Sequence, residues 1–174
     1  NLDPDDYKMI FREHLSETML GEDFLNRLGP TIDTATVVNP AHTYHVRSAA
    51  DHHVLEAMRV RNFVKHIDAA AGMTPGSPER GLTLDKAGHL MYASHLSYTN
   101  DARLGAPECD LLVQLVRQRE KAGLYGAKIT GGGSGGTVAV LLESTSRAAD
   151  ALAELIRTYE SQTGRKTDLF AGSS

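Results

Sequence analysis

A run of glycines is the part of this sequence whose residue types are best suited to binding chemistry. Six of the 16 glycines among the 174 residues fall between Gly126 and Gly136. The run itself occupies positions 131–136 and reads Gly131, Gly132, Gly133, Ser134, Gly135, Gly136. Without Cβ atoms, successive backbone amides can closely approach another group, and phosphate-binding loops use this property. An ordinary hairpin needs only one or two glycines. The run is therefore the candidate binding segment.

The flanking residues decide between the motifs that share this glycine spacing. Segments 124–130 and 137–142 are rich in β-branched residues, which predicts a strand, a glycine loop and a second strand. A dinucleotide fingerprint and a hydrolase nucleophile elbow both require a helix directly after the loop. The loop of protein kinases fits two strands, but its partner motifs do not follow, and no Gly-Lys-Ser/Thr ends the run as in a Walker A loop. A hairpin tip without a role stays an alternative.

A group of histidines offers a second candidate site. His42, His45, His52 and His53, together with Asp51, supply residue types that zinc binds. Their spacing fits no standard zinc motif, and no cysteine joins them. The sequence therefore favours ordinary polar histidines over a metal site, and we expect no metal.

Three single residues have a structural and a functional interpretation. His95 lies on the apolar face of a predicted helix, which favours a hydrogen-bonded core histidine. Ser97 and Asp101 nearby keep a substrate-facing role open. Cys109 is expected to be a buried small residue, because no basic neighbour favours a thiolate. Lys128 is expected to be a solvated strand residue rather than a catalytic one.

Hydrophobic periodicity predicts the elements that position these residues. Residues Val60, Phe63, Val64, Ile67 and Ala71 recur at helical spacing. One helix is predicted to start at Asp3-Pro4, and another to span 51–71. Two more are predicted to start near Thr83 and at Pro107, and the last to run from a cap at 144–146 to Gly164. Extended segments are expected at 36–38, 44–46 and 168–170, the last closing the sheet.

Composition narrows the class of protein. The chain is 41% hydrophobic and 23% charged, with one cysteine and a net charge of -4. This predicts one ordinary domain without disulfides, in a cytoplasmic setting. The acidic balance argues against nucleic-acid or anionic-membrane partners, and no apolar run is long enough to span a membrane. The first residue is Asn1 rather than Met, so we expect a piece of a longer protein.

Segment 126–136 resembles the third motif of the GHMP kinases, the superfamily that includes galactokinase, homoserine kinase and mevalonate kinase. Segments 52–60, 88–97 and 104–113 resemble, in the same order, the helices and the turn that precede this motif in the family. The resemblance covers about 47–142. Galactokinases usually carry Phe and Cys where Ser134 and Thr137 stand. These departures, with 44–47 and 170–174, are more similar to L-arabinokinase-type members.

The resemblance implies an α+β domain, with helices packed on a small antiparallel sheet in a ferredoxin-like arrangement. Residues 1–47 would be an N-terminal helix and connector, and 48–174 the C-terminal core of a kinase. It also implies phosphorylation of the anomeric hydroxyl of arabinose or galactose by ATP, with Mg²⁺ bridging the phosphates and Gly131 to Gly136 lining the nucleotide site.

In this family, the phosphate loop Pro-x-x-x-Gly-Leu-x-Ser-Ser and the catalytic carboxylate belong mainly to the N-terminal half. Neither motif occurs here. The resemblance therefore implies a partner, the N-terminal kinase domain in cis, which would supply the catalytic residues and most contacts to ATP and Mg²⁺. The isolated piece would be inactive. The alternative is a non-enzymatic module that senses a ligand or binds a partner.

Overall fold

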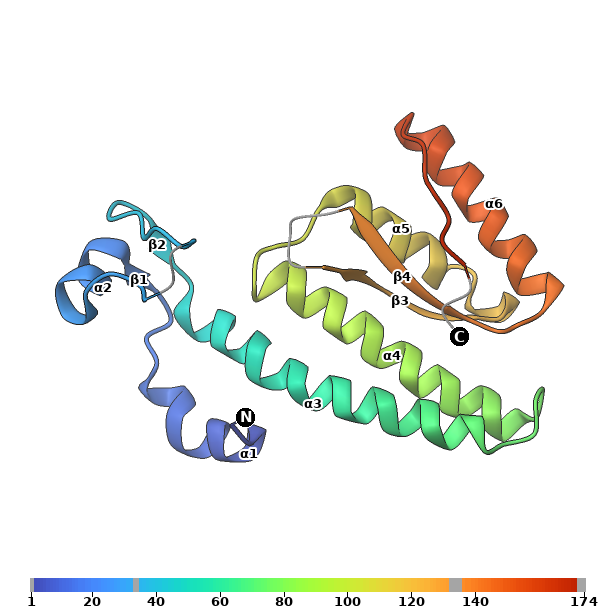
Figure 1. Cartoon of the computed structure of the whole chain (residues 1–174), viewed down its shortest axis with the longest axis horizontal. Coiled ribbons are helices and arrows are strands. Elements are labelled where there is room, and N and C mark those ends of the chain that lie inside the picture. Colours follow the sequence, from blue (N-terminus) through green and yellow to red (C-terminus); the bar gives the residue numbers. More distant parts are fainter. Residues whose placement is uncertain (1, 33–34, 132–135, 172–174) are drawn as a thin grey trace. The chain divides into compact units, whose positions relative to one another are not determined.

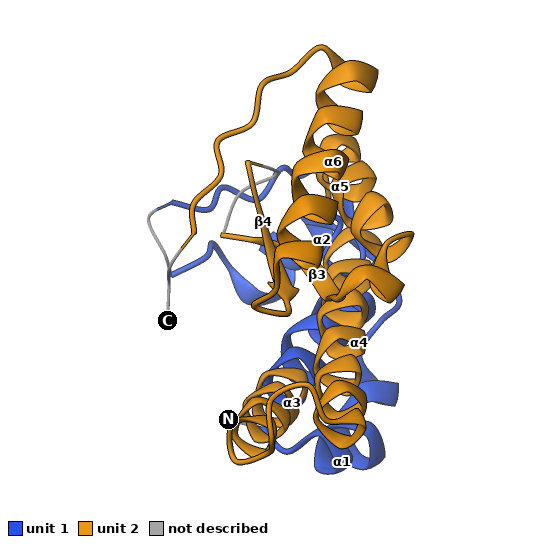
Figure 2. Ribbon diagram, turned by 90° about the vertical axis from the view of Figure 1, so that its right-hand side faces the viewer, with its two compact units in different colours: residues 1–58, 101–103 blue, residues 59–100, 104–174 orange. Residues whose placement is uncertain are grey.

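The computed structural model describes residues 2–32, 35–131 and 136–171, and these form two compact units. Residues 1–58 with 101–103 make up unit 1, and residues 59–100 with 104–174 make up unit 2 (Figure 2). The sequence-based division into 1–47 and 48–174 stays a prediction. The described ranges contain no helix with the length and apolar character needed to cross a membrane.

Unit 1 begins with the helix that Asp3 and Pro4 predict. Helix α1 (Pro4–Asp6) starts where the Asp3 carboxylate accepts a hydrogen bond from the Asp5 amide at 2.9 Å. The chain continues as a π-helical turn over 7–11 and a 3-10 turn over 12–14. Strand β1 (Met19–Leu20) then leads into helix α2 (Gly21–Leu28), which the sequence patterns did not indicate.

Two expected extended segments of unit 1 differ from the structure. Strand β1 pairs antiparallel with β2 (Thr43–Tyr44), so the expected strand at 44–46 is shorter and lies one residue earlier. Residues 36–38 form no strand. Gly21 explains part of this arrangement, because a Cβ there would overlap the backbone of Asn39. The close approach of Gly21 to Asn39 holds the connector between α2 and β2 in place without a further strand.

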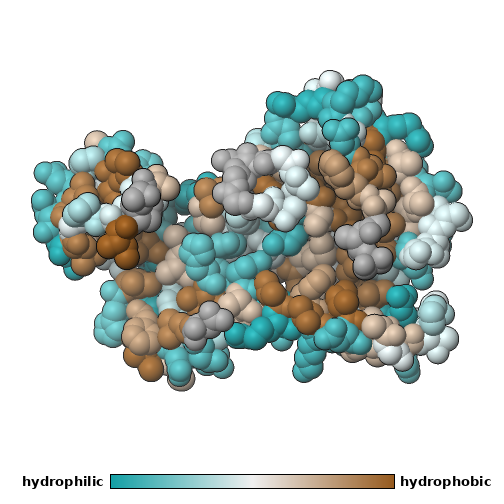
Figure 3. All heavy atoms as spheres, in the orientation of Figure 1, coloured by the Kyte–Doolittle hydropathy of each residue, from teal (hydrophilic) through white to brown (hydrophobic). Residues whose placement is uncertain are grey.

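Helix α3 (Val46–Ala71) confirms the helix expected over 51–71 but begins five residues earlier. Residues 46–50 contain no glycine or proline that would stop it. Its apolar stripe is not a buried core: the side chains of Val60 and Val64 are 52% and 49% exposed. Hydrophobic surface is visible on both units (Figure 3).

Unit 2 consists of helices packed on a two-stranded antiparallel sheet (Figure 1). It includes α3 from residue 59 onward. Its other elements are α4 (Pro78–Asn100), α5 (Pro107–Arg117), a 3-10 turn (Glu120–Ala122), β3 (Leu124–Thr130), β4 (Thr137–Leu142) and α6 (Ser146–Thr163). Val116, Leu124 and Ala127 are fully buried in the core between the sheet and helices α5 and α6. The α+β class is confirmed. The ferredoxin-like description stays a prediction, since the described residues pair only two strands in this sheet.

Helix α4 runs beside strand β3 and touches its backbone (Figure 1). At Gly88, a Cβ would overlap the carbonyl of Tyr125, and a Cβ on Gly126 would overlap the Gly88 backbone. Two glycines therefore permit a contact that no larger residue allows. This contact sets the distance between α4 and the sheet.

The end of the described chain differs from the expectation. Helix α6 starts at the Thr145 cap, whose hydroxyl accepts from the Ala148 amide at 3.3 Å, and ends at left-handed Gly164, as predicted. The expected strand at 168–170 does not form. Instead, the Glu160 carboxylate accepts a 3.0 Å hydrogen bond from the amide of Thr167. This contact holds the segment after α6 against the end of its own helix.

Candidate functional site

The glycine run lies between β3 and β4, as the β-branched flanks predict. Its described ends are Gly131, with φ 93°, and Gly136, with φ 119°. Both angles lie in a region that side chains rarely adopt, and among the described residues no atom beyond the chain neighbours lies within 4 Å of the position that a Cβ would take at either glycine. The remaining members of the predicted site, Gly132, Gly133, Ser134 and Gly135, lie outside the described residues. The two ends thus border open space.

Strand β3 reaches the glycine run through Ile129, two residues before Gly131. Ile129 is 2% exposed and packs against Ala106 and Cys109 of the turn and helix that follow α4. Its backbone N–H donates a hydrogen bond to Nδ1 of His95 in α4, at 3.3 Å. The entry to the run is therefore held by side chains as well as by β4. Burial of Cys109 confirms the expectation for that residue.

His95 is a core histidine, as its apolar helix face predicts, and is 7% exposed. Its Nε2 lies 3.1 Å from Oδ1 of Asp110 in α5, and the hydroxyl of Thr99 donates to the same oxygen at 3.2 Å. Burial lowers the pKa of His95 below its ordinary value, although Asp110 opposes this effect; the charge of Lys128 lowers it further. The neutral ring donates from Nε2 and accepts at Nδ1.

His95, Thr99 and Asp110 form the His95 cluster, and the sequence patterns singled out neither Thr99 nor Asp110. A histidine on a buried helix face needs a hydrogen-bond partner, and Asp110 lies in the next helix, three residues after Pro107. That requirement is a usable signal, but the sequence does not show which of several acidic residues meets it. Ser97, the alternative substrate-facing neighbour of His95, is buried at 5% exposure.

Lys128 lies on β3 opposite Ala139 and is partly exposed. Its neighbours Ala127 and Ile129 face the core, so strand alternation directs Lys128 to the other face of the sheet. This position fits a solvated residue. The assignment of Lys128 as non-catalytic stays a prediction.

The histidines of unit 1 do not assemble a metal site with Asp51. The Asp51 carboxylate accepts from Nε and Nη2 of Arg12 at 2.8 and 2.9 Å and from the hydroxyl of Tyr7 at 2.8 Å. The ring of His42 packs edge-on against the ring of Tyr44, with 4.6 Å between the ring centroids. Within 2–32, 35–131 and 136–171, no three His, Cys, Asp or Glu side chains are grouped to hold a metal ion.

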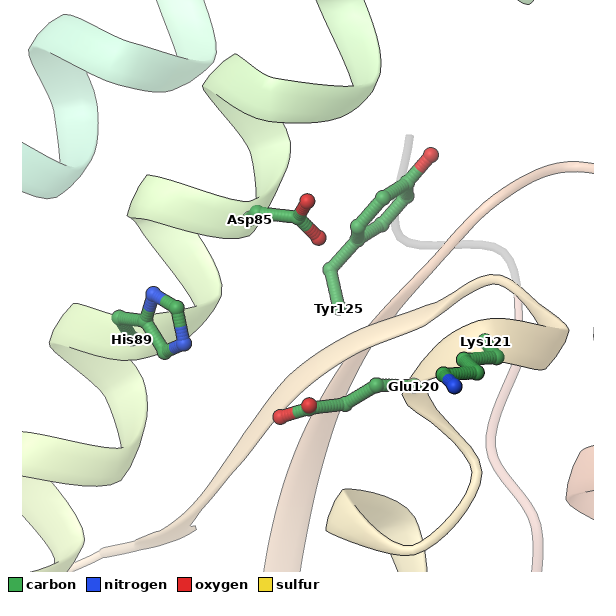
Figure 4. A pocket seen from close by; sticks show the side chains of 5 residues that line it. All are labelled: Asp85, His89, Glu120, Lys121 and Tyr125. Atoms are coloured by element: carbon green, nitrogen blue, oxygen red, sulfur yellow. The ribbon is translucent and has the colours of Figure 1, made fainter.

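A pocket lies elsewhere in unit 2 (Figure 4). It is lined by Asp85, His89, Glu120, Lys121 and Tyr125, from α4, the 3-10 turn and the start of β3. Tyr125 and the glycine run occupy opposite ends of β3, about 20 Å apart at the rise of a strand. The pocket is therefore separate from the candidate binding segment.

Comparison with known proteins assigns the core of unit 2. Residues 81–161 match the family model described as GHMP kinases C terminal. This segment runs from the first turn of α4 to the last turn of α6 and includes the glycine run and the His95 cluster. Residues 81–161 form a GHMP kinase C-terminal domain. The resemblance seen in the sequence is confirmed.

Relatives of this GHMP kinase C-terminal domain are sugar kinases. L-arabinokinase of Arabidopsis thaliana is 35% identical over 181 aligned residues, which cover 100% of the chain and 17% of that protein. Galactokinase of Chloroflexus aurantiacus is 39% identical over 48% of the chain and 20% of its own length. Galactokinase of Mannheimia succiniciproducens is 32% identical over 70% of the chain and 28% of its own length. The chain thus spans less than a third of these relatives.

Proposed function

We propose that this chain is the C-terminal domain of an ATP-dependent sugar kinase that phosphorylates an anomeric hydroxyl. The observation that carries the proposal is the family match over 81–161, which includes the strand, glycine run and strand that the sequence predicts. Arabinose is the preferred substrate within the arabinose and galactose class. The alignment with L-arabinokinase extends over both units, whereas that with the Chloroflexus aurantiacus galactokinase covers 48% of the chain.

Gly131 to Gly136 are proposed to line the nucleotide site. Bound ATP supplies the phosphoryl group that is transferred. Open space beside Gly131 and Gly136, together with positive φ at both, fits the approach of a phosphate to backbone amides. Ser134 is proposed to add a hydroxyl toward the phosphate. The contribution proposed for this chain is a set of backbone and hydroxyl donors beside the phosphate, where they would stabilise developing charge.

Mg²⁺ and the catalytic carboxylate are proposed to be held by the N-terminal kinase domain, which would pair with this chain in cis. The described residues group no three metal-ligating side chains. The 174-residue chain alone is therefore expected to show no sugar phosphorylation, and measurable turnover by it would contradict the proposal.

The decisive assay uses the full-length protein with ATP, Mg²⁺ and a panel of arabinose, galactose and glucuronate. ADP release in the presence of sugar is the measurement, and arabinose is expected to give the highest kcat/KM. Absence of turnover with every sugar would overturn the kinase proposal. Sugar or nucleotide binding without turnover would favour a non-enzymatic sensor of the same fold.

A further inference from the structure

We propose that His95 is a positioning residue that fixes the entry to the glycine run only while its ring is neutral. The inference rests on the proposed function, because it assigns a pH-dependent control to the same nucleotide site. Its structural part can be tested without ATP. The two kinds of failure are therefore distinguishable.

The first step is the hydrogen bond that joins α4 to β3. The N–H of Ile129 donates to a side chain, Nδ1 of His95, at 3.3 Å. Ile129 lies two residues before Gly131, so the bond is about 7 Å from the first glycine of the run, measured along the strand. Both partners are buried, at 2% and 7% exposure, so water is poorly placed to replace the bond.

The second step is the choice of tautomer. Oδ1 of Asp110 lies 3.1 Å from Nε2 of His95. An ionised carboxylate has no proton to donate, so Asp110 acts as the acceptor of this hydrogen bond. The single ring proton of neutral His95 therefore sits on Nε2, which leaves the Nδ1 lone pair for Ile129. Thr99 donates to the same Asp110 oxygen at 3.2 Å and helps to orient it. Asp110 thus acts on the strand through the histidine.

The third step is the effect of a second proton. Protonation of Nδ1 turns the acceptor into a donor that faces the N–H of Ile129, so the bond is lost and two donors oppose each other. Asp110 from α5 contacts the ring, and the charge of Lys128 from β3 acts on it from a distance. Asp110 favours the charged ring, whereas burial and Lys128 disfavour it. The net lowering of the His95 pKa keeps the tether intact at neutral pH and places its loss on the acid side.

The consequence is a control on the nucleotide site that needs no ligand at a second site. When His95 is neutral, its Nδ1 joins the end of β3, at Ile129, to α4. When His95 is charged, that end of the strand loses its hydrogen bond to α4 and is held only by its pairing with β4 and by the packing of Ile129. Nucleotide affinity of the full-length kinase is then expected to fall with decreasing pH.

Nuclear magnetic resonance of the ¹⁵N-labelled 174-residue chain tests the tether itself. At neutral pH, the ring nitrogen shifts of His95 are expected to show the Nε2–H tautomer. On acidification, the amide shifts of Ile129 and Gly131 are expected to move with the same midpoint as the His95 ring. A proton on Nδ1, or an Ile129 amide that does not follow the ring, would overturn the proposal.

Two conservative variants separate tethering from packing. His95→Asn places an amide oxygen near the position of Nδ1, so it retains an acceptor for Ile129 but does not titrate. His95→Gln reaches toward Asp110 and loses that acceptor. Amide exchange at Ile129 is expected to be about tenfold faster in His95→Gln than in His95→Asn, and pH-independent tethering is expected in the latter. Cys109→Ala, which alters the packing around Ile129, is the packing control and should leave the His95 tautomer and the response of the Ile129 amide to pH intact.

The functional part is tested on the full-length protein. The KM for ATP is expected to rise on acidification in the wild type and to stay nearly constant in His95→Asn. Identical pH profiles for the two proteins would refute the control of the nucleotide site, even if the resonance data establish the tether. Absence of kinase activity in the wild type would instead refute the proposed function.

Discussion

Replacing Gly88 by Ala is expected to destabilise unit 2, although alanine is the better helix former. Away from contacts, Gly→Ala inside a helix stabilises by about 1 kcal/mol. At Gly88, the new methyl group would overlap the Tyr125 carbonyl, which belongs to the backbone of β3 and cannot rotate away. Overpacking of this kind costs about 3 kcal/mol at the upper end of its usual range. The net loss is therefore about 2 kcal/mol in free energy of unfolding.

Gly81→Ala is the matched control because it lies in the same helix. Outside its own helix turn, no atom of the described residues lies within 4 Å of a Cβ at Gly81, so only the helix propensity changes, and a gain of about 0.5–1 kcal/mol is expected. Urea unfolding followed by far-ultraviolet circular dichroism measures both changes. Changes of the same sign in both variants, or a stable Gly88→Ala, would refute the close contact between α4 and β3.

Three further changes test unit 1 and the start of α6. Asp51→Asn is expected to lower the free energy of unfolding by about 1–2 kcal/mol, since the half-exposed Arg12 loses a charged partner while the Tyr7 hydroxyl keeps an acceptor. Denaturant unfolding measures this change, and an unchanged midpoint would contradict the bond between Arg12 and Asp51. Although burial opposes them, the bonds from Arg12 and Tyr7 lower the pKa of Asp51 below 3.8, so the contribution of Asp51 to stability is present above that pH and is lost as the pH falls further. Burial and the bond to Asp51 raise the pKa of Tyr7 to about 12, so the contribution of Tyr7 to stability is lost as the pH rises from 10 to about 12. A tyrosinate absorbance titration that shows every tyrosine ionising near pH 10 would count against the Tyr7 part. Thr145→Ala removes the cap of Ala148 and is expected to cost about 1 kcal/mol, measured by thermal unfolding, with Thr145→Ser as the variant that retains it.

The elements of unit 2 were predictable because each carries its own local signal. Pro107 begins α5, Thr145 caps the helix that ends at left-handed Gly164, and β-branched residues flank the glycine run. The segment at 168–170 has the composition of a strand, but a strand also needs a partner edge. Glu160 binds Thr167 instead, so local composition was not decisive there.

The candidate site was predictable only in its backbone part. The glycines mark the run because they indicate where the backbone can take positive φ and where another group can approach it closely, and both are local properties. The tether at Ile129 depends on residues 34 positions apart, and its tautomer depends on a third residue in another helix. The buried histidine signals that a partner exists, whereas only the fold shows which residue it is. For the same reason, Val60 and Val64 mark a helix stripe correctly without showing that it stays exposed.

The contact between Gly88 and Gly126 has a geometric consequence for the glycine run. Along α4, Gly88 and His95 are seven residues apart, about 10.5 Å at the rise of an α-helix. Along β3, Gly126 and Ile129 are three residues apart, about 10 Å at the rise of a strand. Because Gly88 meets Gly126 and His95 meets Ile129, helix and strand run in the same direction, and the matching spans let them touch at both points. If the second point opens, the four residues of β3 after Gly126 lose their hydrogen bond to α4, and their pairing with β4 alone then carries the backbone into the glycine run.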